Sequence, residues 1–173
     1  MKKILAILMV LCMFACSAAL AEPVELNWED VEPALSAGGV QGDFVTFDEI
    51  AVKIWLPSDL KPTELSDEDR EAGYIGYFQT DAQDAIVSVM YVDVDGTSLE
   101  DYAAQLPDLG ATEIEMVTLN GLNGVSYKLE ENDTVSIAFT TEAGYILEVT
   151  MWPASEEGAD LVWGCVGASI QAE

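Results

Sequence analysis

Residues 112–152 read TEIEMVTLNGLNGVSYKLEENDTVSIAFTTEAGYILEVTMW, and their pattern predicts four strands joined by tight turns. In the third of these strands Val135, Ile137 and Phe139 alternate with small or polar residues, so one face is apolar. The fourth strand, residues 145–152, carries apolar side chains on both faces. Burial on both faces is typical of a strand in the middle of a sheet. We therefore expect this segment to be the scaffold that the other elements cover or extend.

Short turn sequences separate these strands. The pairs Asn120-Gly121 and Asn123-Gly124 both favour turn geometry, because asparagine and glycine tolerate positive φ. Glu131-Asn132 and residues 141–144 separate the next two pairs of apolar runs. The connections are short enough for hairpins, which predicts that neighbouring strands pair antiparallel.

Further strands are expected upstream. Residues 44–47 and 50–56 predict a strand pair, and Pro57 stops the second strand. Residues 74–79 and 85–93 predict a hairpin. We expect residues 50–56 and 85–93 to extend the central sheet.

Two amphipathic helices are expected to cover the sheet. Ser98, followed by Asp101, has the spacing of a capping box before a helix over residues 99–106. Ser155 likewise predicts the cap of a helix whose apolar stripe runs over residues 159–170. Such a stripe is more typical of a helix packed on a core than of a cofactor site.

The N-terminus has the pattern of a secretory signal. Met1–Lys3 is basic, and the apolar run over residues 4–15 is too short to span a bilayer. Two cleavage sites compete: Ala21 has small residues at the spacing of ordinary signal peptidase, whereas Cys16 ends a poor lipoprotein box. We favour cleavage after Ala21, with acylation at Cys16 as the alternative. The predicted location is therefore secreted or at the cell surface.

The organisation predicted from these features has three parts. Residues 1–21 form the signal peptide, and residues 22–42 form an acidic tether with a short helix over residues 28–35. Residues 43–173 form a single α+β domain, a length that is enough to bury a core without disulfides. No membrane insertion is expected once the signal has been removed.

The charge excludes whole classes of partner. Six basic residues stand against 32 acidic ones, for a net charge of -26. So few cations cannot form the basic surface that nucleic acid or an anionic membrane requires. Acidity of this size suits a solvated surface, bound cations or a basic partner. The predicted partner is an unidentified protein or cationic ligand.

The residue inventory also limits the chemistry. The chain contains no histidine, which removes histidine-dependent nucleophile systems and histidine metal sites. Glycine-rich nucleotide loops are absent. Cys165 has no basic neighbour in sequence that would activate its thiol. Carboxylate chemistry remains, but the sequence nominates no pair of acids. No catalytic or organic cofactor-binding residue is therefore predicted.

One local motif suggests a metal ion. Asp93 and Asp95 stand in the run Asp-Val-Asp-Gly-Thr, which begins like a calcium-binding loop of oxygen ligands. The acid that such a loop needs at its twelfth position would fall on Ala104. A turn between a strand and a helix accounts for the same residues. Weak calcium binding at Asp93 and Asp95 is the hypothesis we carry forward.

The order of elements resembles that of the PsbP-like fold. A strand pair, an acidic loop and a hairpin precede the segment Gly96–Ala103, and the Asn120-Gly121 turn, three strands and a closing helix follow. The resemblance spans about residues 43–171 and rests on element order, because the local motifs are weak. It implies an α+β fold, with a central antiparallel sheet of about six to eight strands and helices packed on it as an α/β/α sandwich. It also implies mostly non-catalytic binding roles, and no functional residue can be carried over.

Three functions follow from this sequence. The leading hypothesis is a secreted or cell-surface, non-catalytic binding or accessory domain of unknown ligand. The first alternative is a carboxylate-dependent hydrolase of envelope polysaccharide. The second is a structural lipoprotein acylated at Cys16.

Overall fold

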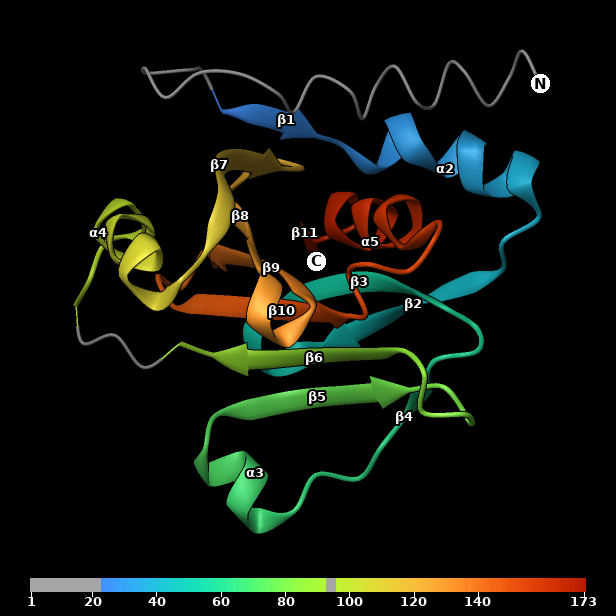
Figure 1. Cartoon of the computed structure of the whole chain (residues 1–173), viewed down its shortest axis with the longest axis horizontal. Coiled ribbons are helices and arrows are strands. Elements are labelled where there is room, and N and C mark those ends of the chain that lie inside the picture. Colours follow the sequence, from blue (N-terminus) through green and yellow to red (C-terminus); the bar gives the residue numbers. More distant parts are fainter. Residues whose placement is uncertain (1–22, 93–95) are drawn as a thin grey trace.

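The computed structural model describes residues 23–92 and 96–173, which form two sheets and four α-helices (Figure 1). The larger sheet has eight strands in the order β1-β7-β8-β9-β10-β6-β5-β4. Its strands are β1 (Val24–Leu26), β4 (Lys61–Pro62), β5 (Tyr74–Gln79), β6 (Ile86–Tyr91), β7 (Thr112–Leu119), β8 (Leu122–Leu129), β9 (Thr134–Thr140) and β10 (Ile146–Trp152). The smaller sheet, in the order β11-β3-β2, contains β2 (Gly42–Phe47), β3 (Val52–Pro57) and β11 (Gln171–Ala172). The helices are α2 (Trp28–Gly38), α3 (Asp67–Glu71), α4 (Leu99–Gln105) and α5 (Ala159–Ala168).

The four strands predicted over residues 112–152 are confirmed. Strands β7 to β10 follow one another across the large sheet as antiparallel neighbours. Strand β10 lies between β9 and β6, with Val149 opposite Ile137 on one side and Val89 on the other. Leu147 and Val149 are fully buried. The apolar residues on both faces of β10 therefore reflect a central position, as the sequence indicated.

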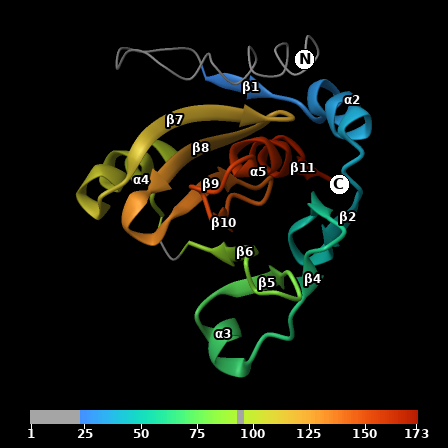
Figure 2. The ribbon, with the colours of Figure 1, turned by 45° about the vertical axis from the view of Figure 1, so that its right-hand side comes forward.

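Helices cover both faces of this sheet, as the α/β/α prediction requires. Helix α4 lies on one side of β7–β10 and α5 on the other (Figures 1 and 2). The Ser98 hydroxyl accepts a hydrogen bond from the Asp101 amide at 3.1 Å, which confirms the predicted cap of α4. On the α5 face, Trp163 and Val166 pack in the same core as Ile54 of β3 and Phe139 of β9.

The prediction that residues 50–56 extend the central sheet is wrong. Strand β3 pairs with β2 and β11 instead, and the resulting sheet packs across the core from the large one. Both faces of β3 are buried, with Ile54 on one and Trp55 on the other. The amide of Trp55 donates to the Ser169 hydroxyl at 2.8 Å, just after α5. An interior strand of either sheet would show the same apolar pattern, so the pattern did not distinguish them.

Two further local predictions need correction. Helix α5 begins after Gly158 and not after Ser155. The amide and the hydroxyl of Ser155 both donate to the Asp133 carboxylate, at 2.8 and 3.0 Å, which ties Ser155 to the residue just before β9 instead of to the first turn of α5. The pair Asn123-Gly124 lies within β8 and is not a turn. A Cβ at Gly124 would meet the Ala138 oxygen at 3.1 Å, so glycine serves close packing there.

Residues 24–38, which the sequence analysis assigns to the tether, supply a strand and a helix. Strand β1 pairs with the end of β7 in parallel, so the largely antiparallel sheet has one parallel pair at its edge. The Asn120 side chain accepts from the Trp28 amide at 2.9 Å and donates to the carbonyl oxygens of Ala168 and Ile170, each at 2.8 Å. The turn after β7 therefore joins the start of α2 to the end of α5. The boundary at residue 43 stays a prediction.

No helix within residues 23–92 and 96–173 has the length and apolar character of a membrane span.

Candidate binding cleft

A cleft of about 400 Å³ opens between α2 and the strand pair β2–β3. Residues of α2 line one part of the cleft, and Val40 and Gln41, in the connection from α2 to β2, line another. Figure 1 shows the course of this connection. The hydrogen bond from the Ser58 amide to the Gln41 oxygen, at 2.9 Å, closes one end of the strand pair. The residues that line the cleft are Trp28, Glu32, Leu35, Ser36, Val40, Gln41, Gly42, Asp43, Trp55 and Ser58.

Two tryptophans line this cleft, and Phe44 packs beside one of them. The rings of Trp28 and Trp55 have centroids 5.7 Å apart and are tilted by 36°. The ring of Phe44 meets that of Trp28 edge to face, with centroids 5.2 Å apart. Trp55 is buried, Trp28 is half-buried and Phe44 is 38% exposed. The solvent exposure of the three rings therefore increases from Trp55 through Trp28 to Phe44.

Glycine at position 42 allows the Trp55 ring to lie where it does. A Cβ at Gly42 would be 2.3 Å from Cζ2 of Trp55 and 2.3 Å from the Leu56 oxygen, which no side chain could tolerate. The indole therefore lies against the β2 backbone. Just before this strand, Gly39 ends α2 in the left-handed conformation, with φ 73°, and turns the chain toward β2.

Two acidic residues line the same cleft. Glu32 follows Trp28 by one helical turn, so the two side chains share a face of α2. Asp43 comes from β2, and both acidic residues are exposed. The lining contains no lysine or arginine. The cleft thus combines aromatic rings, whose faces carry partial negative charge, with two acidic residues.

A lysine side chain lies beside one of these aromatic rings. The ammonium nitrogen of Lys53, on the neighbouring strand β3, lies 5.2 Å from the centroid of the Phe44 ring. This distance is within the range of a cation–π contact. One ring of this aromatic cluster therefore already has a cation beside it in the folded protein.

The predicted calcium ligands cannot be placed. Asp93 and Asp95 lie outside the described residues, so calcium binding there stays a prediction. A smaller cleft of about 280 Å³ is lined by residues that include Thr97, Ser98 and Asn123. Within residues 23–92 and 96–173, no group of three or more acidic or cysteine side chains is arranged to hold a metal ion.

A second polar cluster lies under α4. The hydroxyl groups of Tyr102 and Tyr127 are 3.0 Å apart, and Tyr102 donates to the Glu148 carboxylate at 3.1 Å. Thr150 donates to the same carboxylate at 2.8 Å and is 3.0 Å from the Ser136 hydroxyl. Burial, together with the negative charge of Glu148, raises the pKa of Tyr102 to about 12. Each of these polar groups has a partner, so the cluster reads as a satisfied part of the core.

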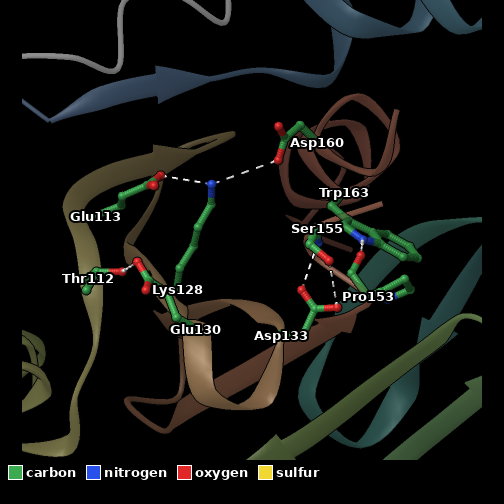
Figure 3. A network of polar contacts seen from close by, with 9 residues as sticks. All are labelled: Thr112, Glu113, Lys128, Glu130, Asp133, Pro153, Ser155, Asp160 and Trp163. Atoms are coloured by element: carbon green, nitrogen blue, oxygen red, sulfur yellow. Dashed lines mark hydrogen bonds and ion pairs between the residues drawn. The ribbon is translucent and has the colours of Figure 1, made fainter. Parts of the chain in front are cut away.

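A third cluster joins the large sheet to the start of α5 (Figure 3). The Lys128 ammonium is 2.9 Å from the Glu113 carboxylate and 3.9 Å from that of Asp160. The Trp163 indole nitrogen donates to the Pro153 oxygen at 2.6 Å. Cys165 on the same helix is a buried free thiol, and burial raises its pKa to about 11.

Sequence reasoning did not identify the cleft residues. Trp28 was placed only within the short helix over residues 28–35, and Trp55 only within the strand over residues 50–56. The two tryptophans are far apart in sequence, and only the packing of α2 on the small sheet brings them together. The usable signal was weak: an aromatic residue and an acid one helical turn apart, at Trp28 and Glu32.

The comparisons with known proteins support the fold. No protein-family model and no curated protein matches the sequence. The solution structure of cyanobacterial PsbP (CyanoP) from Synechocystis sp. PCC 6803 is similar, with a TM-score of 0.51 and 12% identity over 78% of this chain and 94% of that one. A crystal structure from Bacteroides thetaiotaomicron VPI-5482 gives a TM-score of 0.45 and 15% identity over 77% of this chain and 49% of that one.

The chain therefore has a PsbP-like α+β fold, as the order of its elements predicted. At 12% identity the likeness to cyanobacterial PsbP is one of fold. Function has to be argued from the side chains of the cleft.

Proposed function

We propose that the protein is a secreted or cell-surface, non-catalytic binding module whose cleft between α2 and β2–β3 takes a cationic group. One observation carries the proposal: Trp28 and Trp55 line the same cleft as Glu32 and Asp43, and no basic side chain lines it. An ammonium or guanidinium group is attracted by both kinds of wall. The net charge of -26 acts in the same direction at longer range.

The expected affinity for a single cationic group is modest. A cation on an aromatic face contributes about 0.5 to 2 kcal/mol, depending on how far it is desolvated. Exposed carboxylates such as those of Glu32 and Asp43 add about 1 kcal/mol or less each, because water and salt screen them. A dissociation constant on the order of millimolar is consistent with such contributions.

Calorimetric titration with N-acetyl-lysinamide tests the proposal. The trimethylated lysine derivative and the uncharged norleucine derivative are the comparison ligands. We expect both cations to bind and the neutral analogue to bind at least tenfold more weakly. Quenching of tryptophan fluorescence reports the same event, because two of the four tryptophans lie in the cleft.

Matched variants locate the site. Glu32→Gln and Asp43→Asn should each weaken binding about two- to fivefold, which is the effect of losing one partly screened charge. Glu29→Gln is the control, because Glu29 is an exposed acid on the same helix that does not line the cleft. The proposal fails if the norleucine derivative binds as well as the cations, or if the control loses as much affinity as the cleft variants.

A carboxylate-dependent hydrolase of envelope polysaccharide is the second candidate. The observation that favours it is that two acidic residues, Glu32 and Asp43, line one cleft, since glycoside hydrolysis uses a pair of acids. A screen of purified protein against envelope glycans separates the two functions. Turnover that is lost in Glu32→Gln or Asp43→Asn would replace the binding proposal with this one.

The proposed location has its own test. Mass spectrometry of the mature protein should find a chain that begins at Glu22, as cleavage after Ala21 requires. A lipid-modified N-terminal Cys16 would instead support the structural lipoprotein.

A further inference from the structure

Strand β2 offers backbone hydrogen-bonding groups along its whole outer edge. The Ser58 amide donates to the Gln41 oxygen, so Gln41 and Ser58 form a hydrogen-bonded pair of the β2–β3 ladder. Hydrogen-bonded pairs recur at every second residue, so Asp43 and Val45 also direct their backbone groups toward β3. The amide of Trp55 bonds away from β2, to Ser169, as this alternation requires. The amide and carbonyl groups of Gly42, Phe44 and Thr46 therefore point outward, and none bonds to another residue within 23–92 and 96–173.

The other sheet edges in the described part of the chain are short or interrupted. Strands β4 and β11 have two residues each and β1 has three, whereas β2 has six. Strand β1 covers part of the outer edge of β7. The pairing of β7 with β8 is also irregular, because its register shifts between Thr112 and Glu115. Short edge strands and bulges prevent unwanted pairing. Strand β2 has neither device, nor a proline or a lysine in its sequence, Gly-Asp-Phe-Val-Thr-Phe.

The charge around β2 selects the kind of strand that can pair with it. Glu32 and Asp43 line the cleft at one end of β2, and Asp48 and Glu49 follow the other end. Lys53 is the basic residue of the neighbouring strand, and it lies over Phe44. A second copy of this chain would bring another net charge of -26 to the same edge. Electrostatic repulsion therefore disfavours a homodimer and favours a basic strand.

Resting on the proposed function, we infer that the partner is an extended basic peptide segment that adds a strand to the free edge of β2 and places a lysine or arginine in the Trp28–Trp55 cleft. Strand addition supplies sequence-independent backbone bonds, and a side-chain pocket supplies selectivity. Gly42 ties the two features together, because it belongs to the free edge and also forms part of the cleft. A residue of the added strand beside Gly42, on the face that holds Trp55, directs its side chain into the cleft.

Titration with a blocked hexapeptide of alternating valine and lysine tests the inference. In an extended strand all of its lysines lie on one face, spaced about 7 Å apart. We expect it to bind at least tenfold more tightly than N-acetyl-lysinamide, and the matched valine–glutamine peptide to bind at least tenfold more weakly than the lysine peptide. Two further peptides carry N-methyl groups on all valine amides or on all lysine amides. Only one of these two series should lose binding, because alternate amides of a strand face the same edge.

Amide hydrogen exchange locates the bound peptide independently of any variant. On binding, the amides of Phe44 and Thr46 should become at least tenfold more protected, whereas that of Val45, already directed toward β3, should change little. Equal effects of the two N-methyl series, unchanged protection of Phe44 and Thr46, or dimerisation of the protein through β2 would each overturn the inference. If N-acetyl-lysinamide still binds in those cases, the proposed function survives. If N-acetyl-lysinamide also fails to bind, the proposed function and the strand-addition inference are both wrong.

Discussion

The indole of Trp55 occupies the space in which a side chain of residue 42 would begin, because a Cβ on Gly42 would lie 2.3 Å from its Cζ2 atom. This contact fixes the inner wall of the cleft. It also makes Gly42 a position where the smallest substitution matters. Gly42→Ala forces Trp55 or the β2 backbone to move, and we expect a loss of about 1 to 3 kcal/mol in the free energy of unfolding.

Urea denaturation of Gly42→Ala and wild type measures this effect. Gly38→Ala is the matched control, because the nearest atom to a Cβ there is 3.8 Å away and the residue lies in α2. Alanine in a helix is favoured over glycine by about 0.5 to 1 kcal/mol, so the control should be neutral or stabilising. Equal stability of the two variants would show that Trp55 moves without cost.

The same contact shows where sequence reasoning reached its limit. The alternation of Val135, Ile137 and Phe139 reports burial directly, because each side chain meets the core along its own strand. Strands β7 to β10, the cap of α4 and the PsbP-like order of elements could therefore be predicted. The pairing partners of a strand that is apolar on both faces could not be predicted in this way, and β3 was therefore assigned to the wrong sheet. Its neighbour β11 has only two residues and no periodicity.

The cleft was beyond sequence reasoning for a related reason. Trp28 and Trp55 belong to segments that have separate local patterns, and their contact depends on how α2 packs on the small sheet. Gly42 is needed only because of the orientation of the Trp55 ring, which no local rule specifies. Residues that define a site through tertiary packing leave no periodic signal in the chain.

Asn120 should be the most sensitive turn residue. Its side chain makes three hydrogen bonds, to the Trp28 amide and to the oxygens of Ala168 and Ile170, and its φ is 47°. Asn120→Gly keeps the left-handed backbone but removes all three bonds, at about 1 kcal/mol each. We expect a loss of roughly 2 to 3 kcal/mol in denaturant unfolding.

The neighbouring Asn-Gly pair provides the control for Asn120. Asn123 is exposed in β8, so Asn123→Ala should change stability by about 0.5 kcal/mol or less. Because Asn120 also holds the first amide of α2, Asn120→Gly should weaken binding of N-acetyl-lysinamide, while Asn123→Ala should not. Unchanged binding in Asn120→Gly would show that α2 holds its place by packing alone.

Lys128 should contribute a small, salt-dependent stabilisation. Its ammonium lies 2.9 Å from the Glu113 carboxylate, and the side chains are 30% and 63% exposed. Ion pairs this open to solvent are worth about 0.2 to 1 kcal/mol. The hydrogen bond to Glu113 raises the pKa of Lys128, so this contribution is present below the ordinary lysine pKa of 10.5 and disappears as the pH rises through the higher folded value.

A double-mutant cycle with Lys128→Gln and Glu113→Gln isolates that pair. The coupling free energy at low salt should fall toward zero in about 1 M salt, where the screening length is only about 3 Å. A coupling that is insensitive to salt would mean that the methylene groups of Lys128 stabilise the sheet by packing, with little help from the charge.

The tyrosine pair under α4 should make the fold sensitive to alkali. Burial and the Glu148 charge raise the pKa of Tyr102 from 10.0 to about 12, and they raise the pKa of Tyr127 as well. The folded state therefore favours the neutral phenols. The contribution of Tyr102 to stability is complete below pH 10, the pKa in the unfolded chain, and is lost as the pH rises through about 12. The contribution of Tyr127 has the same sign.

Phenolate absorbance followed against pH checks this sign. In the wild type the last tyrosines to ionise should do so together with unfolding, because a phenolate at Tyr102 would face the Glu148 carboxylate 3.1 Å away. Tyr127→Phe removes one hydroxyl partner and should cost about 1 kcal/mol at neutral pH. Tyr145→Phe is the control, since Tyr145 is 57% exposed, and it should leave the delayed ionisation in place. If Tyr127→Phe leaves both the neutral-pH stability and the alkaline transition unchanged, the hydroxyl of Tyr127 contributes nothing beyond the packing of its ring. The chain Tyr102–Glu148–Thr150 would then hold the α4 face of the sheet without it.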